Sequence, residues 1–317
     1  MTFQNPGIPP LEARISSLLK WKLIDRPPRR PPAGPIPRTE PSFATPRATA
    51  GAVGVTWIGH SSFLIQLGAV NVLTDPMWSD RASPVQWAGP KRLSPPGFPI
   101  DRLPPIDLVV QSHNHYDHLD DRTVRLLARA HPDASWVAPL GVGSFLKERG
   151  ARTVSEHQWW DEVKVVGLEL ACTPAQHFSG RGFRDRNQSL WCGWVIRQGS
   201  KRLYFCGDSG YHREFAEIGR RHGPFDVALM PIGAYEPRWF MSPVHMDPAE
   251  SVTAFRDLHR SHGSEQRGVF VPMHWGTFRL TDEPVEEPPM LTAEHWRKAE
   301  LPDANLWQLA LGETRRL

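Results

Sequence analysis

Short apolar runs separated by turn residues dominate this chain from Val53 onwards. Three of them follow each other closely, over residues 53–57, 63–67 and 70–74, and predict consecutive short strands. Gly68 carries the turn between the second and the third, because glycine accepts backbone angles that other residues avoid. This part of the chain is therefore predicted to form strands joined by tight turns.

Further strands alternate with helical spacing of apolar positions in the rest of the chain. Strands are predicted over 108–111, 226–231 and 269–272, and residues 152–206 form a β-rich stretch. Helices are predicted over 120–131, 247–261 and 292–299. Groups of strands with interspersed helices fit an α/β fold arranged as a four-layer sandwich.

Residues 1–50 differ from the remainder, and we separate them as an extension from a domain over 51–317. Proline recurs throughout the extension and excludes a long helix or a central strand. One short amphipathic helix is predicted over 10–24, where leucine and isoleucine fall at helical spacing beside basic residues and Trp21. Such a helix either lies on a membrane surface or docks on the domain, and the sequence supports both interpretations equally.

Composition excludes several classes of protein. With 40% apolar residues, 13 Trp and 14 Phe, the chain has ample material for a core. Three cysteines in or beside apolar runs indicate small buried side chains in a reducing compartment rather than disulfides. No apolar run is long enough to span a bilayer, and no secretory signal is recognisable, so the cytoplasm is the expected location. A net charge of +3 without a long basic arm argues against nucleic acid as a partner.

The candidate chemistry begins in the loop after strand 108–111. His113, His115, Asp117 and His118 lie within this one loop, and neutral imidazole and carboxylate are good ligands for a divalent metal. Further residues of the same types follow later apolar runs: His177, Asp208 and His274. Because ligands of α/β proteins converge where strands end, we expect all of these side chains to meet at one edge of a sheet.

This set of residues resembles the ligand set of the metallo-β-lactamase superfamily, whose fold is an αβ/βα sandwich. The resemblance implies that His113, His115 and His177 hold one metal. It also implies that Asp117, His118 and His274 hold a second metal and that Asp208 bridges the two. The cofactors expected from it are two Zn²⁺ ions per chain, while iron remains an alternative because histidine and aspartate accept both metals.

A narrower resemblance extends over nearly the whole chain and is to the N-acylphosphatidylethanolamine-hydrolysing phospholipase D family. The stretches that carry it lie at 3–6, 56–60, 73–76, 81–84, 89–92, 103–107, 159–160, 176–177, 207–211, 231–241, 245, 247–248 and 274–278. The chain departs from the family at 242–244. The resemblance implies a zinc phosphodiesterase that releases an N-acylethanolamine and phosphatidic acid from a phospholipid. A hydrolase of a soluble ester, lactone or phosphodiester is the main alternative, and a non-catalytic scaffold is disfavoured because the ligands are retained.

Catalytic roles follow from the same resemblance. His245 is the candidate general acid and is expected to face the substrate phosphate, while Asp117 and Asp208 serve catalysis as metal ligands. Asp75 follows a strand and is interpreted as a carboxylate that orients a ligand histidine, with an ordinary turn as the alternative. Asp120 is expected at a helix start.

Substrate contacts are less specific in the sequence. Tyr116, Tyr235 and Trp239 are the candidate substrate-binding residues. Arginines at 181, 184 and 186 cluster just after His177, and guanidinium groups suit phosphate oxygens, although a solvated surface is the simpler interpretation. Peripheral association with a membrane surface is expected with a phospholipid substrate, and a homodimer is left open.

Overall fold

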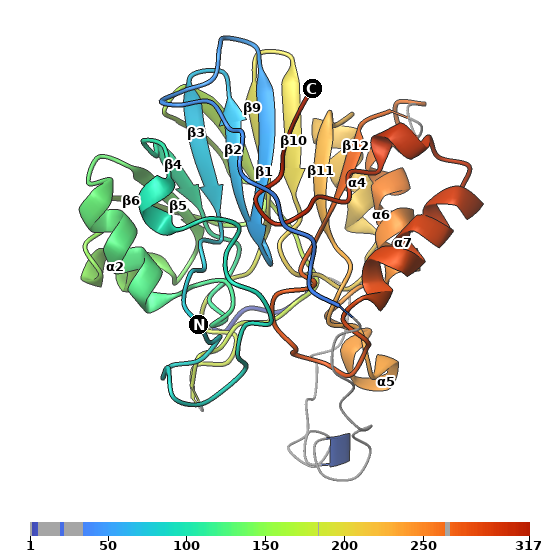
Figure 1. The fold of residues 1–317 in the computed structure, drawn as a ribbon, viewed down its shortest axis with the longest axis horizontal. Coiled ribbons are helices and arrows are strands. Elements are labelled where there is room, and N and C mark those ends of the chain that lie inside the picture. The colour runs from blue at the N-terminus through green and yellow to red at the C-terminus, as the bar shows by residue number, and fades with distance from the viewer. Residues whose placement is uncertain (1, 6–19, 22–33, 183, 264–266) are drawn as a thin grey trace.

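Two mixed β-sheets face each other at the centre of the molecule (Figure 1). The computed structural model describes residues 2–5, 20–21, 34–182, 184–263 and 267–317. A seven-stranded sheet has the order β13-β1-β2-β3-β4-β5-β6, and a six-stranded sheet has the order β12-β11-β10-β9-β8-β7. The strands of the first are β1 (Val53–Gly59), β2 (Ser62–Leu67), β3 (Val70–Thr74), β4 (Leu108–Val110), β5 (Ser135–Pro139), β6 (Thr153–His157) and β13 (Thr314–Arg316). Those of the second are β7 (Glu162–Val165), β8 (Leu168–Thr173), β9 (Gly193–Gln198), β10 (Lys201–Phe205), β11 (Val227–Pro231) and β12 (Val269–Met273).

Helices cover the outer faces of both sheets, so the predicted four-layer sandwich is confirmed. In Figure 1, α2 (Asp121–Ala130) lies on one side and α4 (Glu214–His222), α6 (Pro248–Arg260) and α7 (Glu287–Lys298) lie on the other. The shorter helices are α3 (Gly143–Glu148) and α5 (Arg238–Met241), with 3₁₀ turns at Ile100–Arg102 and Asp303–Asn305.

Successive side chains of a strand point to opposite faces of its sheet, and apolar residues at both kinds of position explain why both faces are buried. In β2, Phe63 and Ile65 belong to the core between the sheets, whereas Leu64 belongs to the cluster that packs on the α2 side. Val124 and Leu127 of α2 complete that second cluster. Each such buried side chain stabilises the fold by about 1.5–3 kcal/mol.

The parallel parts of the sheets place their strand ends together. β3, β4, β5 and β6 run parallel, as do β10, β11 and β12. Asp75 follows β3, the ligand loop follows β4, Asp208 follows β10 and His274 follows β12. The sheet topology therefore delivers the candidate ligands from separate strands to one edge.

Most elements predicted in the domain are confirmed, with shifts at their ends. Helix α7 begins at Glu287 rather than at residue 292, although prolines follow Glu287 directly. Proline is tolerated there because the amides of a first helical turn have no hydrogen-bond partner within the helix, so their absence costs nothing. Helix α6 starts as predicted, with Asp247 and Glu250 forming a capping box around Pro248. The sequence analysis did not identify β5, β13, α3, α4 and α5.

Asp120 stands at the predicted helix start but does not cap it. It occupies the N-cap position of α2 without accepting a hydrogen bond from the first-turn amides. Its carboxylate instead accepts from the amide and the hydroxyl of Ser79, at 3.1 and 2.9 Å, and from the hydroxyl of Thr123. Asp120 thus ties the loop after β3 to helix α2.

The predicted helix over 10–24 lies outside the described residues except for Lys20 and Trp21. Trp21 is buried against Ala234 and Met241, and its indole donates to the carboxylate of Asp282. The segment from residue 34 runs along the domain, where the Thr39 amide donates to Leu311 O. Within the described ranges, no helix has the length and apolar character that crossing a bilayer requires. The cysteines Cys172, Cys192 and Cys206 are buried and free, as predicted.

Candidate metal centre

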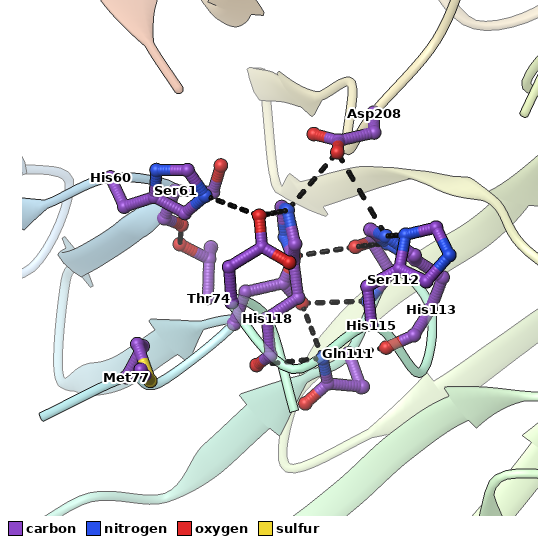
Figure 2. Close-up of polar contacts among 12 residues, drawn as sticks. His60, Ser61, Thr74, Met77, Gln111, Ser112, His113, His115, His118 and Asp208 are labelled. Carbon is purple, nitrogen blue, oxygen red and sulfur yellow. Dashed lines mark hydrogen bonds and ion pairs between the residues drawn. The ribbon is translucent and has the colours of Figure 1, made fainter. Parts of the chain in front are cut away.

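The ligand loop begins directly after β4, which ends at Val110, and His113 in this loop is fully buried. The chain then turns, and the amides of His118 and Leu119 both donate to His115 O, at 3.1 and 2.8 Å. This compact turn brings His113, His115 and His118 together beside Asp208 (Figure 2).

One set of ligands consists of three histidines, and we call His113, His115 and His177 the imidazole group. Nδ1 of His115 lies 2.9 Å from Nε2 of His113 and 3.2 Å from Nε2 of His177. Their ligand atoms all lie within 4.8 Å of one another, which is the arrangement needed to share one metal ion.

The other set combines a carboxylate with two histidines, and we call Asp117, His118 and His274 the carboxylate group. Oδ2 of Asp208 lies 3.1 Å from Nε2 of His118 and 3.0 Å from Nε2 of His274. The same oxygen is 3.9 Å from Nε2 of His113 and 3.8 Å from Nε2 of His177. Asp208 therefore lies between the two groups, as the bridging role requires.

The two groups have opposite electrostatics. Burial, with help from neighbouring imidazoles, lowers the pKa of His115 to about 3, and burial lowers that of His177 to about 4. Burial also disfavours charge on His274, but Asp208 and Asp117 outweigh it and raise the pKa of His274 to about 9. Despite burial, nearby histidines hold the pKa of Asp117 and Asp208 well below the usual range.

A buried carboxylate behind the ligand loop holds His118 in place. Oδ2 of Asp75 is 2.7 Å from Nδ1 of His118, which leaves Nε2 of His118 directed at the centre. Asp75 also accepts from the Ser112 amide at 2.7 Å and from the Gln111 side chain at 2.9 Å. Asp75 therefore lies where a carboxylate that orients a ligand histidine would lie, and that role stays a prediction.

The imidazole group is held by neutral partners instead. Nδ1 of His113 lies 2.8 Å from the hydroxyl of Ser112, and Nδ1 of His177 lies 2.9 Å from Val244 O. In both rings this contact fixes which nitrogen faces the metal position.

His60 lies in the centre, although the sequence analysis did not include it among the candidate site residues. Its Nε2 lies 2.9 Å from Oδ2 of Asp117, and its ring lies 4.1 Å from that of His274. His60, Asp75 and His274 all have positive φ, which is unusual outside glycine and is concentrated at functional sites. The only sequence signal was its position in a Gly-His pair after the first strand.

Gly207 allows Asp208 to approach the ligand loop. It has φ +64°, and a Cβ at this position would lie 2.7 Å from Cys192 O and 2.8 Å from Cβ of Ser112. A larger residue would push the end of β10 away from the loop.

The residues present fit divalent metal ions. Nε2 of His118, Nε2 of His274 and Oδ1 of Asp208 are buried without a hydrogen-bond partner in the described part of the chain. Unpartnered buried polar atoms are costly, and here they converge with neutral imidazoles and ionised carboxylates on one point. Metal ligation would satisfy these atoms.

His245 lies at the margin of both groups. Its ring centre is 5.0 Å from that of His177 and 5.2 Å from that of His274, and one of its nitrogens lies within 4.8 Å of ligand atoms of His177 and Asp208. Burial lowers the pKa of His245 well below its usual value. The position suits a proton donor or a further ligand, and the catalytic role stays a prediction.

Arg181 supports the ligand loop from the outside. Its guanidinium donates to Asn114 O at 2.8 Å and to Leu119 O at 2.7 Å, and it lies 3.9 Å from the ring centre of Tyr116. The Tyr116 hydroxyl donates to Arg181 O in return, at 2.8 Å. Of the predicted arginine cluster, Arg186 lies over the ring of Phe178, which packs against His115 and His177.

The remaining substrate candidates follow β11, Tyr235 on a loop and Trp239 on α5. The Tyr235 hydroxyl donates to Glu287 at 2.6 Å, and the side chain is buried. Trp239 on α5 is 51% exposed, with Nζ of Lys20 5.5 Å from its ring centre. Their substrate contacts stay predictions.

Comparison with known proteins identifies relatives over most of the chain. Residues 70–275 match the family described as the β-lactamase superfamily domain. An uncharacterised protein of Mycobacterium tuberculosis is 45% identical over 273 residues, which are 86% of this chain and 71% of that protein. The N-acyl-phosphatidylethanolamine-hydrolysing phospholipase D 1 of Caenorhabditis elegans is 41% identical over 244 residues, which are 74% of this chain and 67% of that protein. The solved structure of Igni18, a metallo hydrolase from Ignicoccus hospitalis, has a TM-score of 0.61 at 24% identity and covers 84% of this chain and 98% of its own.

Proposed function

We propose a specific reaction for this chain, which belongs to the metallo-β-lactamase superfamily and is a metal-dependent hydrolase. It is a binuclear zinc phosphodiesterase that hydrolyses N-acylphosphatidylethanolamine to an N-acylethanolamine and phosphatidic acid. The observation that carries this proposal is the assembly of two ligand groups around Asp208. The similarity to the phospholipase D of Caenorhabditis elegans supports the choice of substrate.

Zinc ions held by the two groups would lower the pKa of water toward neutrality and stabilise charge on the phosphoryl oxygens. The chain's own residues would hold these ions through His113, His115 and His177 on one side and Asp117, His118 and His274 on the other. Asp208, between them, would contribute its carboxylate to both. Asp75 and His60 fix the orientation of His118 and Asp117 from behind.

Product analysis tests the reaction directly. The zinc-loaded protein is incubated with mixed phospholipids that include N-acylphosphatidylethanolamine, and the products are identified by mass spectrometry. N-Acylethanolamine with phosphatidic acid is the expected pair, and it should be absent with Asp208→Asn protein. Release of a free fatty acid, or turnover of soluble esters, lactones or phosphodiesters alone, would reject the lipid reaction. Two zinc ions per chain by elemental analysis are expected, and iron in their place would reject the zinc assignment.

We assign the general acid to His245. An alkoxide leaving group departs readily only when it is protonated, and a positioned acid contributes about 100- to 10,000-fold. Because burial lowers the pKa of this imidazole, the negative charge of a bound phosphodiester would be needed to hold the proton there.

His245→Ala should retain both metals and lose turnover of the natural lipid. The loss should be much smaller for a diester with a nitrophenolate leaving group, which needs little protonation. Equal loss on both substrates would show that His245 positions the phosphate. Loss of a metal would instead make His245 a ligand.

We further propose that the enzyme binds the membrane surface peripherally. Exposed tryptophans on two loops that begin at the site edge support this: Trp87, 82% exposed, after β3, and Trp239 on α5 after β11. Tryptophan beside lysine, as at Trp239 and Lys20, suits a lipid headgroup region.

Trp87→Ser and Trp239→Ser should each weaken sedimentation with anionic phospholipid vesicles. Met290→Ser is the matched control, because Met290 is also exposed, at 66%, but lies on α7. Equal effects of all three substitutions would reject a specific membrane surface. A homodimer remains a prediction that size measurement in solution would test.

A further inference from the structure

We propose that Asn5, close to the start of the chain, is a positioning residue for the metal ligand His177. Nδ2 of Asn5 donates to His177 O at 2.8 Å, and the His177 amide donates to Oδ1 of Asn5 at 3.0 Å. One side-chain amide thus pairs with both main-chain groups of a ligand 172 positions later in the sequence. The proposal rests on the metal site described under the proposed function.

His177 depends on this contact because it lies beyond the sheet. β8 ends at Thr173, and the intervening residues include only a single bridge between Gln176 and Gly210. In the described ranges, Asn5 is the hydrogen-bond partner of both the amide and the carbonyl of His177. The Nδ1 atom of the ring lies against Val244 O, so the backbone and the ring are held by different loops.

Asn5 is itself firmly placed. Its Oδ1 also accepts from the indole of Trp191 at 2.9 Å, and that indole donates in addition to Ala175 O at 2.9 Å. The Phe3 amide donates to Asn187 O at 2.8 Å and anchors the segment on its other side. A carboxamide is needed here, since aspartate lacks the donor for His177 O and alanine lacks both groups.

Displacing His177 should affect one metal and spare the other. His177 belongs to the imidazole group, whereas the carboxylate group has its own supports in Asp75 and His60. Loss of a partner that orients a ligand typically costs about 10- to 100-fold in metal affinity. We therefore expect Asn5→Ala to lower the affinity for one zinc ion by this factor and to leave the affinity for the second unchanged.

The experiment compares Asn5→Ala, Asn5→Asp and the control Gln4→Ala in the full chain. Gln4 is exposed in the same segment, so its substitution should change nothing. Zinc affinities are measured by competition with a chelator, stoichiometry by elemental analysis, and site geometry by the absorption bands of the cobalt-substituted protein. His177→Ala provides the reference for complete loss of the metal in the imidazole group.

We expect Asn5→Ala to bind one of its two metals with lower affinity, and Asn5→Asp to show a smaller loss of affinity for the same metal. In Asn5→Ala the cobalt absorption bands should change, and excess zinc should restore activity. Two metals bound with wild-type affinity in Asn5→Ala would overturn the proposal. Equal weakening of both metals together with a lower melting temperature would also overturn it, because Asn5 would then support the fold in general. If the wild-type protein itself binds no metal, the proposed function fails, and that outcome is distinct from the others.

Discussion

The imidazole group and the carboxylate group lie on either side of Asp208, yet they are built from different chemistry. The imidazole group has three neutral rings, held from behind by a hydroxyl, a carbonyl and a carboxamide. The carboxylate group has ionised Asp117 beside His118 and His274, and it is held by buried Asp75 and His60. One position is organised by hydrogen bonds to neutral groups and the other by charge.

This difference determines what each group must lose to bind a metal. The imidazoles with pKa values of about 3 and 4 are already unprotonated at neutral pH, so their lone pairs are available. His274, with a pKa of about 9, must release a proton before its Nε2 can ligate. Preorganised geometry should therefore control affinity in the imidazole group, whereas proton competition should control it in the carboxylate group.

Asp208→Asn should have the largest effect, because it removes the one residue that the two groups share. The amide keeps the size of the side chain but cannot offer a negatively charged oxygen to each metal. Activity should fall by several orders of magnitude, and metal content should fall in both groups. Turnover close to that of the wild type would show that the groups act independently of Asp208.

The pH dependence of metal binding should distinguish the two groups. Below about pH 9 the ring of His274 is protonated, so a metal displaces a proton and its affinity falls as the pH falls, by about tenfold per pH unit for each proton released. The rings of the imidazole group lose no proton near neutrality, so their affinity should stay constant there. Chelator competition between about pH 6 and about pH 8 measures both. Parallel pH dependence of the two metals would contradict the division.

The sequence indicated the candidate ligands but, of their supports, only Asp75. Each candidate ligand follows a run that forms a strand or lies close beyond one, and strand ends converge in this topology, so the assembly around Asp208 could be expected. The other support residues lack such a signal: His60 reaches Asp117 only through tertiary packing and a left-handed backbone conformation. Asn5 reaches His177 across 172 positions of the sequence.

Arg181 illustrates that residue type alone does not identify the partner of a side chain. The arginine cluster suggested phosphate contacts, with a solvated surface as the simpler interpretation, whereas the Arg181 guanidinium donates to the carbonyl oxygens of Asn114 and Leu119 in the ligand loop. Burial lowers its pKa, which is the cost of taking a cation out of water to hold a loop.

The elements missed in the fold, such as α3 and β13, are short and have too few residues to establish a period.

Asp75→Asn should have the smallest effect and provide the finest test of the comparison. Asp75 contacts His118 directly, whereas it reaches His113 only through the hydroxyl of Ser112, which donates to Asp75 while it contacts Nδ1 of His113. An amide nitrogen facing Nδ1 of His118 would favour the tautomer whose proton is on Nε2, where the metal should bind. Affinity in the carboxylate group should fall by about 10- to 100-fold, with a smaller loss in the imidazole group.

Ser112→Ala is the matched counterpart to Asp75→Asn. It removes the relay to His113 but leaves the contact between Asp75 and His118, so the pattern of losses should be reversed. Zinc competition on the two variants, each compared with the wild type, gives the affinity of each metal separately. If both substitutions weakened the two metals equally, the groups would form a single network, and the distinction between support by neutral groups and support by charge would be wrong.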